Sequence, residues 1–251
     1  MSSNIQELLN TYKDRCKTNC RPYLILGSNG HAREMLQTSR NSLGNIQNST
    51  LYEYFGFILE NELATFNKGF QDKKYILEEE LIEELIEKFP LNASQNRKVY
   101  LGIGIGSPKI KEKIYKKYKK EHRVNFVNIV SNLAQAEESI NGWVFKPEQG
   151  LYIANNVNLT TNVSLGKHVH LNTACTVCHD AKIDDFSIVS PGAIVCGNVS
   201  IGKRCYIGAG AVIRDGVSIA DDTTIGAGTV VVKDIEETGR TFIGVPAKEL
   251  K

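Results

Sequence analysis

The chain of 251 residues is 41% hydrophobic and 23% charged, with a formal net charge of +2 at pH 7. This composition is typical of a folded globular protein and excludes a collagen-like or disordered chain, and the length allows two domains with separate cores. The nearly balanced charge gives no indication of a nucleic-acid partner.

The N-terminal segment and the cysteines bear on cellular location. The first twenty residues mix charged and apolar side chains and lack the apolar stretch of a signal peptide. No run approaches the roughly 20 apolar residues that cross a membrane. We therefore expect a cytoplasmic protein with no membrane partner. Because cysteines stay reduced in that compartment, we expect free thiols at Cys16, Cys20, Cys175, Cys178, Cys196 and Cys205.

Strands and helices alternate in the first half of the chain. Residues 1–20 are predicted to form a helical extension, and residues 38–50 look like an insertion. The remaining pattern predicts a helix after the first strand, strands at 23–27, 54–59, 98–105 and 124–130, and helices at 78–89 and 108–120. Such alternation predicts a parallel sheet covered by helices. We assign residues 21–135 to a small Rossmann-like α/β domain.

The first strand ends in a glycine-containing turn, Gly27-Ser28-Asn29-Gly30-His31. At the carboxyl end of a parallel strand, the N-terminus of the next helix offers backbone N–H groups to a phosphate. The turn lacks the full G-x-G-x-x-G pattern. A tight strand-to-helix turn without a ligand therefore remains the alternative.

An aliphatic residue recurs every six positions in the second half of the chain. Fourteen consecutive positions follow this rule: Ile153, Leu159, Leu165, Leu171, Val177, Ile183, Val189, Val195, Ile201, Ile207, Ile213, Ile219, Ile225 and Val231. A second series, two residues before each hit from the second onward, is small or β-branched: Val157, Val163, Val169, Cys175, Ala181, Ser187, Ala193, Val199, Cys205, Ala211, Val217, Thr223 and Thr229.

Both series are expected to point inward, because residues two apart on a strand share a face. The period of six predicts a parallel β-helix over residues 136–251, with eighteen residues in each coil. Glycine follows the aliphatic residue at Gly166, Gly202, Gly208 and Gly226. We expect corners with positive φ at these glycines.

Several motifs together resemble a known family. They are the G-x-x-G-H turn, G-F-I-L-E-N at 56–61, I-G-I-G-S-P-K-I-K-E-K-I-Y at 103–115, the coils, and G-V-P-A-K at 244–248. The chain resembles the bacterial nucleotide-sugar N-acetyltransferases over roughly residues 22–250. The resemblance implies a left-handed β-helix, a homotrimer with active sites between subunits, and acetyl-CoA as co-substrate without a metal. The implied acceptor is a 4-amino-4,6-dideoxy sugar carried on UDP, dTDP or GDP.

The implied chemistry needs a base for the attacking amine and a donor for the tetrahedral oxyanion. His179 projects from a coil corner, and Gly197 lies one coil above it. The resemblance, through H-D-A-K-I-D-D at 179–185, implies that His179 is the base and that the Gly197 N–H contacts the oxyanion or thioester carbonyl. The chain departs from the family at Cys178, where an orienting acid is common, and at Ile188, where a second histidine is common. Asp180 or a carboxylate of another subunit is the expected substitute.

Binding residues also follow from the resemblance. The implied nucleotide-sugar set is Gly27, Ser28, Asn29, Gly30, His31, Glu60, Gly106, Ser107 and Asn172, although stacking within the coil is the alternative role of Asn172. The implied coenzyme set is Gly197, Gly208, Ala209, Gly226, Ala227, Lys233, Pro246, Ala247 and Lys248. The nucleobase, the sugar and the 3-amino or 4-amino position stay open.

Other functions compete with this interpretation. C-T-V-C-H at 175–179 spells a haem-attachment motif or a CxxC metal pair, but Cys175 occupies an inward position. A metal-dependent hydrolyase would need His168, His170 and His179 to converge, and His179 comes half a coil later. Two further alternatives are O-acetylation of a sialic-acid-like sugar hydroxyl and a non-catalytic trimeric nucleotide-binding scaffold.

Overall fold

The computed structural model describes residues 20–27, 30–42, 51–59, 76–78, 99–121, 124–136 and 149–250. The chain forms two compact units. The first unit comprises residues 1–105 and 114–127, and the second comprises residues 106–113 and 128–251. Within the described ranges, no helix is long and apolar enough to span a bilayer.

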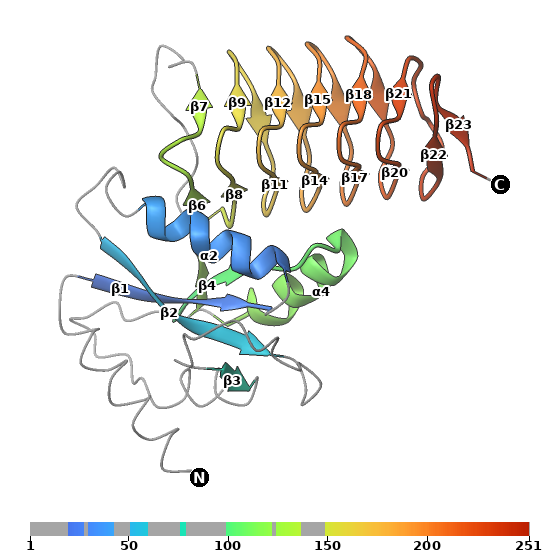
Figure 1. Cartoon of the computed structure of the whole chain (residues 1–251). Coiled ribbons are helices and arrows are strands. Elements are labelled where there is room, and N and C mark those ends of the chain that lie inside the picture. The colour runs from blue at the N-terminus through green and yellow to red at the C-terminus, as the bar shows by residue number, and fades with distance from the viewer. Residues whose placement is uncertain are drawn as a thin grey trace. The chain divides into compact units, whose positions relative to one another are not determined.

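The first unit contains a five-stranded parallel sheet in the order β3-β2-β1-β4-β5 (Figure 1). The strands are β1 (Cys20–Leu26), β2 (Leu51–Leu59), β3 (Ile76–Glu78), β4 (Val99–Ile103) and β5 (Val124–Phe126). The helices are α2 (Gly30–Ser42) and α4 (Pro108–Tyr118), of which α4 is divided between the two units. Strands β1 and β4 are apolar runs whose described side chains are buried, as expected for central parallel strands. The sheet order reverses between β1 and β4, where such sheets bind ligands.

Several predictions for the first half fall outside the described residues or change in detail. The predicted extension at 1–20 lies outside them except for Cys20, which begins β1, and the predicted helix at 78–89 lies outside them except for Glu78, which ends β3. The predicted single strand at 124–130 is two strands. The Val127 N–H donates to the carbonyl oxygen of Leu101 in β4, whereas the Ile129 N–H donates to that of Leu151 in the second unit. The chain therefore changes sheets at Asn128.

The second unit is a parallel β-helix with three sheets of stacked strands (Figure 1), each of two residues except β22, whose pairing with the last strand β23 is antiparallel. The first sheet holds β10 (Ser164–Leu165), β13 (Lys182–Ile183), β16 (Ser200–Ile201) and β19 (Ser218–Ile219). The second holds β6 (Ile129–Val130), β8 (Tyr152–Ile153), β11 (His170–Leu171), β14 (Ile188–Val189), β17 (Tyr206–Ile207), β20 (Thr224–Ile225), β22 (Thr241–Ile243) and β23 (Lys248–Glu249). The third holds β7 (Gln135–Ala136), β9 (Asn158–Leu159), β12 (Thr176–Val177), β15 (Ile194–Val195), β18 (Val212–Ile213) and β21 (Val230–Val231).

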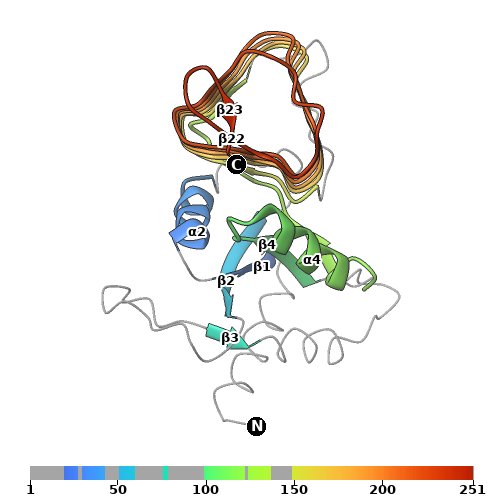
Figure 2. The same ribbon diagram turned by 90° about the vertical axis from the view of Figure 1, so that its right-hand side faces the viewer.

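Both sequence series line the interior of the coil, as predicted. All of their members are buried except Val163 and Leu165, which are half-buried. Val163 precedes β10 and Leu165 ends it, and β10 is the edge strand of its sheet. Burying each aliphatic side chain contributes about 1.5–3 kcal/mol. Seen end-on, successive coils superimpose in a three-sided outline (Figure 2).

The corners have left-handed backbone, but not where the sequence predicted. Positive φ occurs every sixth residue, at Asn156, Asn162, His168, Ala174, Asp180, Phe186, Gly192, Asn198, Arg204, Gly210, Gly216, Asp222 and Gly228. The prediction of positive φ at Gly166, Gly202, Gly208 and Gly226 is wrong. Glycine is needed there because the chain packs closely: a Cβ on Gly208 would lie 2.6 Å from the Ala227 nitrogen, one coil above.

The predicted fold class is confirmed: a small Rossmann-like parallel α/β domain is followed by a left-handed parallel β-helix. The predicted domain boundaries at residues 20/21 and 135/136 stay predictions. In the structure, residues 106–113 group with the β-helix rather than with the sheet that precedes them.

Candidate active site

The candidate base, His179, lies at the corner between β12 and β13. Val177 points into the coil, and the His179 side chain, 52% exposed, extends outward. Its Nδ1 lies 3.0 Å from Oδ2 of Asp180. Asp180 has φ of 59°, and this left-handed conformation turns the chain immediately after the histidine. Neighbours in sequence thus become hydrogen-bond partners at the corner.

Asp180 is itself held from the coil below. Asn162, eighteen residues earlier, donates from Nδ2 to Oδ1 of Asp180 at 2.6 Å. This hydrogen bond, and secondly the one from His179, lowers the pKa of the Asp180 carboxyl. The carboxylate is therefore ionised at neutral pH and accepts a hydrogen bond from Nδ1–H, which leaves the Nε2 lone pair of His179 to act as an acceptor. Asp180 thus meets the requirement for an orienting group that Cys178 does not supply.

Gly197 lies directly against the His179 ring. A Cβ placed on Gly197 would lie 2.5 Å from Nε2 of His179 and 2.9 Å from Oδ1 of Asp215. The predicted juxtaposition of His179 and Gly197 therefore exists, and it requires glycine at the upper position. The sequence analysis missed Asp215 and Asn162. Asp215 lies eighteen residues after Gly197, and Asn162 lies eighteen residues before Asp180, so the coil period could have identified both.

Asn172 takes part in coil stacking. Its side chain is buried, and its Nδ2 donates to the carbonyl oxygen of Val189 in the next coil at 3.0 Å. This is the alternative role that the sequence left open. A part for Asn172 in sugar binding stays a prediction.

The described cysteine side chains are free thiols at Cys175, Cys178, Cys196 and Cys205. Burial raises the pKa of Cys175 and of Cys205 to about 12. Cys175 packs inside the coil with no exposed surface, so covalent haem attachment would require the coil to open. Cys178 and Cys196 are half-buried and occupy equivalent positions in adjacent coils.

The other two coil histidines have packing roles. The His168 ring stacks on Phe186 with centroids 5.4 Å apart, and the His170 ring meets Tyr152 edge-on at 5.5 Å. Both histidines are buried, and desolvation, assisted by the charge of Lys111, lowers the pKa of His168 to about 3. Among the described residues, no three His, Cys, Asp or Glu side chains group as metal ligands. The three-histidine interpretation therefore has no support in the geometry.

The predicted nucleotide-sugar residues are distributed over both units. Gly27 has φ of 105°, and a Cβ there would lie 3.0 Å from the Gly104 carbonyl oxygen, so the ends of β1 and β4 approach closely at the switch point. Gly30 begins α2, with His31 following it. The remaining predicted residues are Ser28, Asn29 and Glu60, which lie outside the described residues, and Gly106 and Ser107, which precede α4 in the second unit.

The predicted coenzyme residues lie on the upper coils and the C-terminal segment. Ala209, Ala227, Lys233, Pro246 and Lys248 are exposed, and Ala247 is half-buried, with its N–H donating to the carbonyl oxygen of Val230 at 2.8 Å. Gly208 and Gly226 are needed for packing against the segments above them. Their contact with coenzyme stays a prediction.

A groove of about 340 Å³ runs over the outer face of β13, β16 and β19. Its walls include Lys182, Ser200 and Ser218, each of which follows the corner that holds His179, Gly197 or Asp215. His179, Gly197 and Asp215 themselves are not among the residues that line this groove.

The repeat defines a hexapeptide coil, and one of its corners carries the His179–Asp180 pair against Gly197. Residues 174–215 and 198–233 match the family described as "Bacterial transferase hexapeptide (six repeats)". No curated protein sequence matches the chain.

Solved structures align over nearly the whole chain. The acetyltransferase domain of PglB from Neisseria gonorrhoeae FA1090 is 27% identical, with a TM-score of 0.71 over 92% of this chain and 100% of that one. The same domain in complex with acetyl coenzyme A aligns at 25% identity and a TM-score of 0.71, over 92% and 99% of the two chains. A mutant of GDP-perosamine N-acetyl transferase from Caulobacter crescentus, in complex with CoA and GDP-perosamine, has the same fold at 23% identity and a TM-score of 0.71, over 92% and 97%. The predicted resemblance to nucleotide-sugar N-acetyltransferases is confirmed.

Proposed function

We propose that the chain transfers an acetyl group from acetyl-CoA to the amino group of a nucleotide-linked amino-dideoxy sugar. The observation that carries the proposal is the His179–Asp180 pair, stacked beneath Gly197 in a hexapeptide coil. Similarity over 92% of the chain to an acetyltransferase domain that is known with acetyl coenzyme A supports the donor. The perosamine enzyme, which shares the fold, motivates the acceptor class.

The residues account for each step of the transfer. The acceptor nitrogen attacks the thioester carbonyl carbon, and Nε2 of His179 takes the proton that the nitrogen loses. Asp180 stabilises the imidazolium through Nδ1–H, as a carboxylate paired with a histidine does. The Gly197 N–H is proposed to stabilise the oxyanion. Collapse of the tetrahedral intermediate breaks the C–S bond, and the proton on His179 passes to the departing thiolate, giving the amide and CoA.

The proposed binding residues form two sets, one for the nucleotide sugar and one for the coenzyme. We assign the nucleotide sugar to Gly27, Ser28, Asn29, Gly30, His31, Glu60, Gly106, Ser107 and Asn172, and the coenzyme to Gly197, Gly208, Ala209, Gly226, Ala227, Lys233, Pro246, Ala247 and Lys248. Support comes from the switch point between β1 and β4, and from the exposed small residues of the upper coils. A 4-amino sugar is the favoured acceptor. The cytoplasmic location stays a prediction.

We also propose that the active unit is a homotrimer. The outer faces of the β-helix expose Ile194 on β15 and Tyr206 on β17, and the C-terminal segment exposes Ile243, Val245 and Leu250. We propose that these side chains lie in the contacts between subunits, where association would remove them from water. Light scattering on the purified chain tests this: a mass of three chains supports the trimer, and a monomer contradicts it.

A thiol-release assay tests the function. Purified protein is incubated with acetyl-CoA and a panel of UDP-, dTDP- and GDP-linked 4-amino and 3-amino sugars, and products are identified by mass spectrometry. We expect one CoA thiol released per acetylated amine with at least one 4-amino sugar, and no release with the corresponding 4-hydroxy sugar. Thiol release with hydroxyl acceptors alone would establish O-acetylation. Absence of transfer to every acceptor would contradict the proposal.

A further inference from the structure

The first turns of α4 are attached to one column of corner residues in the β-helix. The column consists of His168, Phe186, Arg204 and Asp222, which are eighteen residues apart and all have positive φ. The attached segment is residues 106–113, which belong to the same compact unit as the coils. This segment begins with Gly106 and Ser107, two of the residues assigned to the nucleotide sugar.

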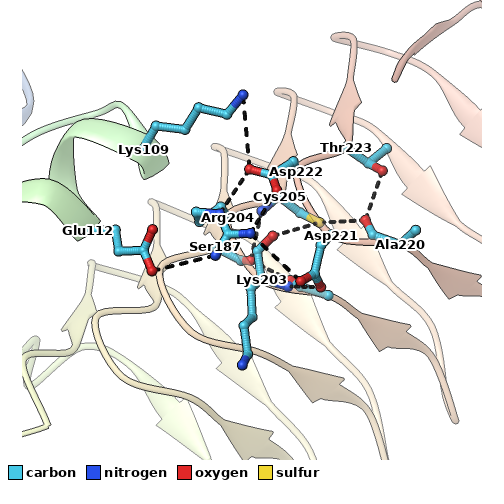
Figure 3. A network of polar contacts seen from close by, with 11 residues as sticks. Lys109, Glu112, Ser187, Lys203, Arg204, Cys205, Ala220, Asp221, Asp222 and Thr223 are labelled. Carbon is cyan, nitrogen blue, oxygen red and sulfur yellow. Dashed lines mark hydrogen bonds and ion pairs between the residues drawn. The ribbon is translucent and has the colours of Figure 1, made fainter. Parts of the chain in front are cut away.

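Arg204 is at the centre of the attachment (Figure 3). Its Nε and Nη2 donate to Oδ1 and Oδ2 of Asp222 at 2.9 and 2.7 Å, a bidentate pair within the column. Its Nη1 lies 3.5 Å from Oε1 of Glu112 on α4. Lys109 Nζ, one helical turn earlier, lies 4.0 Å from Oδ1 of Asp222. Arg204 therefore joins the helix to two adjacent coils.

The pairing with Arg204 has an electrostatic consequence. The guanidinium lowers the pKa of the Asp222 carboxyl, chiefly through its hydrogen bonds. Side chains of Arg204 and Glu112 are only 21% and 19% exposed, so solvent screens them less than a surface pair. The bidentate geometry fixes the plane of the guanidinium and hence the direction in which Nη1 reaches Glu112.

Lys111 provides a second attachment beside the first. Its side chain is fully buried, and Nζ donates to the carbonyl oxygen of His168 at 2.8 Å. Burial lowers the pKa of this amine well below its ordinary value. A buried lysine is a costly way to stabilise a contact between two elements, because an apolar side chain would pack there without desolvating an amine. Its hydrogen bond instead fixes where along the column the helix lies.

We propose that Glu112 and Arg204 are positioning residues for the nucleotide-sugar acceptor. They act through residues 106–113, which they hold against the coils. The Glu112–Arg204 ion pair and the Lys111–His168 hydrogen bond fix the position of this segment along the β-helix axis. The Gly106–Ser107 turn is thereby kept at a fixed distance from His179. This inference rests on the proposed function, in which the Gly106–Ser107 turn binds the nucleotide sugar. Neither residue touches the reacting atoms, so the acceptor affinity, rather than the chemical step, depends on them.

The test compares acceptor and donor kinetics in variants of the full chain. Arg204→Met and Glu112→Gln are expected to raise the acceptor KM about tenfold, with kcat and the acetyl-CoA KM within twofold of wild type. The double variant should be no worse than Arg204→Met, because both changes break the same contact. Arg204→Lys keeps the charge without the bidentate fork and should fall between Arg204→Met and wild type.

A control variant and a binding measurement make the outcome decisive. Arg240→Met removes an arginine whose ion pairs are with Glu237 and Glu249 rather than with a residue of α4, and should leave the acceptor KM unchanged. Titration calorimetry with UDP, dTDP and GDP reports binding whether or not transfer occurs. Weaker nucleotide binding in Arg204→Met, at an unchanged thermal midpoint, supports the inference. The inference would be overturned if wild type and Arg204→Met bound the nucleotides equally well, or if wild type bound none of the three. Equal rises in the acceptor KM and the acetyl-CoA KM would also overturn it. Failure of every sugar in the transfer assay would instead count against the proposed function.

Discussion

Replacing Gly197 by alanine should slow acetyl transfer about a hundredfold by displacing His179. The new Cβ would lie 2.4 Å from Cε1 and 2.5 Å from Nε2 of His179, whereas ordinary van der Waals contact begins near 3.4 Å, so the ring must move by about 1.0 Å. A displacement of ~1 Å at a reacting group costs on the order of 10²-fold in rate. That corresponds to about 2.7 kcal/mol of transition-state stabilisation.

The rate of CoA thiol release, measured at saturating acetyl-CoA and acceptor, gives the kcat that checks this prediction. The matched control is Gly192→Asn. Gly192 lies at another corner with φ of 67°, an added Cβ there meets nothing within 4 Å, and asparagine already occupies such corners at Asn156 and Asn198. The control should retain wild-type kcat. A Gly197→Ala enzyme with kcat within threefold of wild type, and an intact far-ultraviolet spectrum, would refute the assignment of His179 as base.

Three further substitutions test other parts of the structure. His179→Asn should abolish turnover yet leave acetyl-CoA affinity near normal, and calorimetry beside the rate assay separates the two effects. Gly30→Val should raise the acceptor KM far more than the acetyl-CoA KM if α2 begins at the nucleotide; equal rises would make the turn purely structural. Burial lowers the pKa of Lys111 in the folded chain below the ordinary value of 10.5. Between these two pKa values the unfolded chain binds one more proton than the folded chain, so the free energy of unfolding rises with pH by up to about 1.4 kcal/mol per pH unit. Lys111→Met should flatten the rise of the thermal midpoint between pH 7 and 10, and an unchanged pH profile would contradict the buried-lysine geometry.

The periodic part of the fold and of the site could be predicted from the sequence. A residue eighteen positions away in a coil lies one strand spacing above, so Gly197 had to stack over His179 once the period was known. The same rule would have found Asn162 beneath Asp180 and Asp215 above Gly197. The corner conformation was misplaced, because glycine marks close packing at Gly208 and Gly226, whereas the left-handed residues include asparagine, aspartate and even Phe186.

Contacts without a period could not be read in this way. Nothing in the local pattern of P-K-I-K-E-K at 108–113 distinguishes the buried Lys111 from the exposed Lys109 and Lys113, because all three occur in a basic, amphipathic stretch. Likewise, the interruption of the strand at Asn128 depends on which backbone groups accept the next hydrogen bonds.

The sequence by itself determined the coil, its interior and the pairing of His179 with Gly197, because a strict six-residue repeat leaves one way to bury its aliphatic side chains. Only the tertiary structure decided that Asp180 Oδ2 lies within hydrogen-bond distance of His179 Nδ1, an alternative that the sequence had left open, and that residues 106–113 belong with the coils. Those outcomes depend on side-chain direction and on contacts between segments far apart in the chain, which no local pattern encodes.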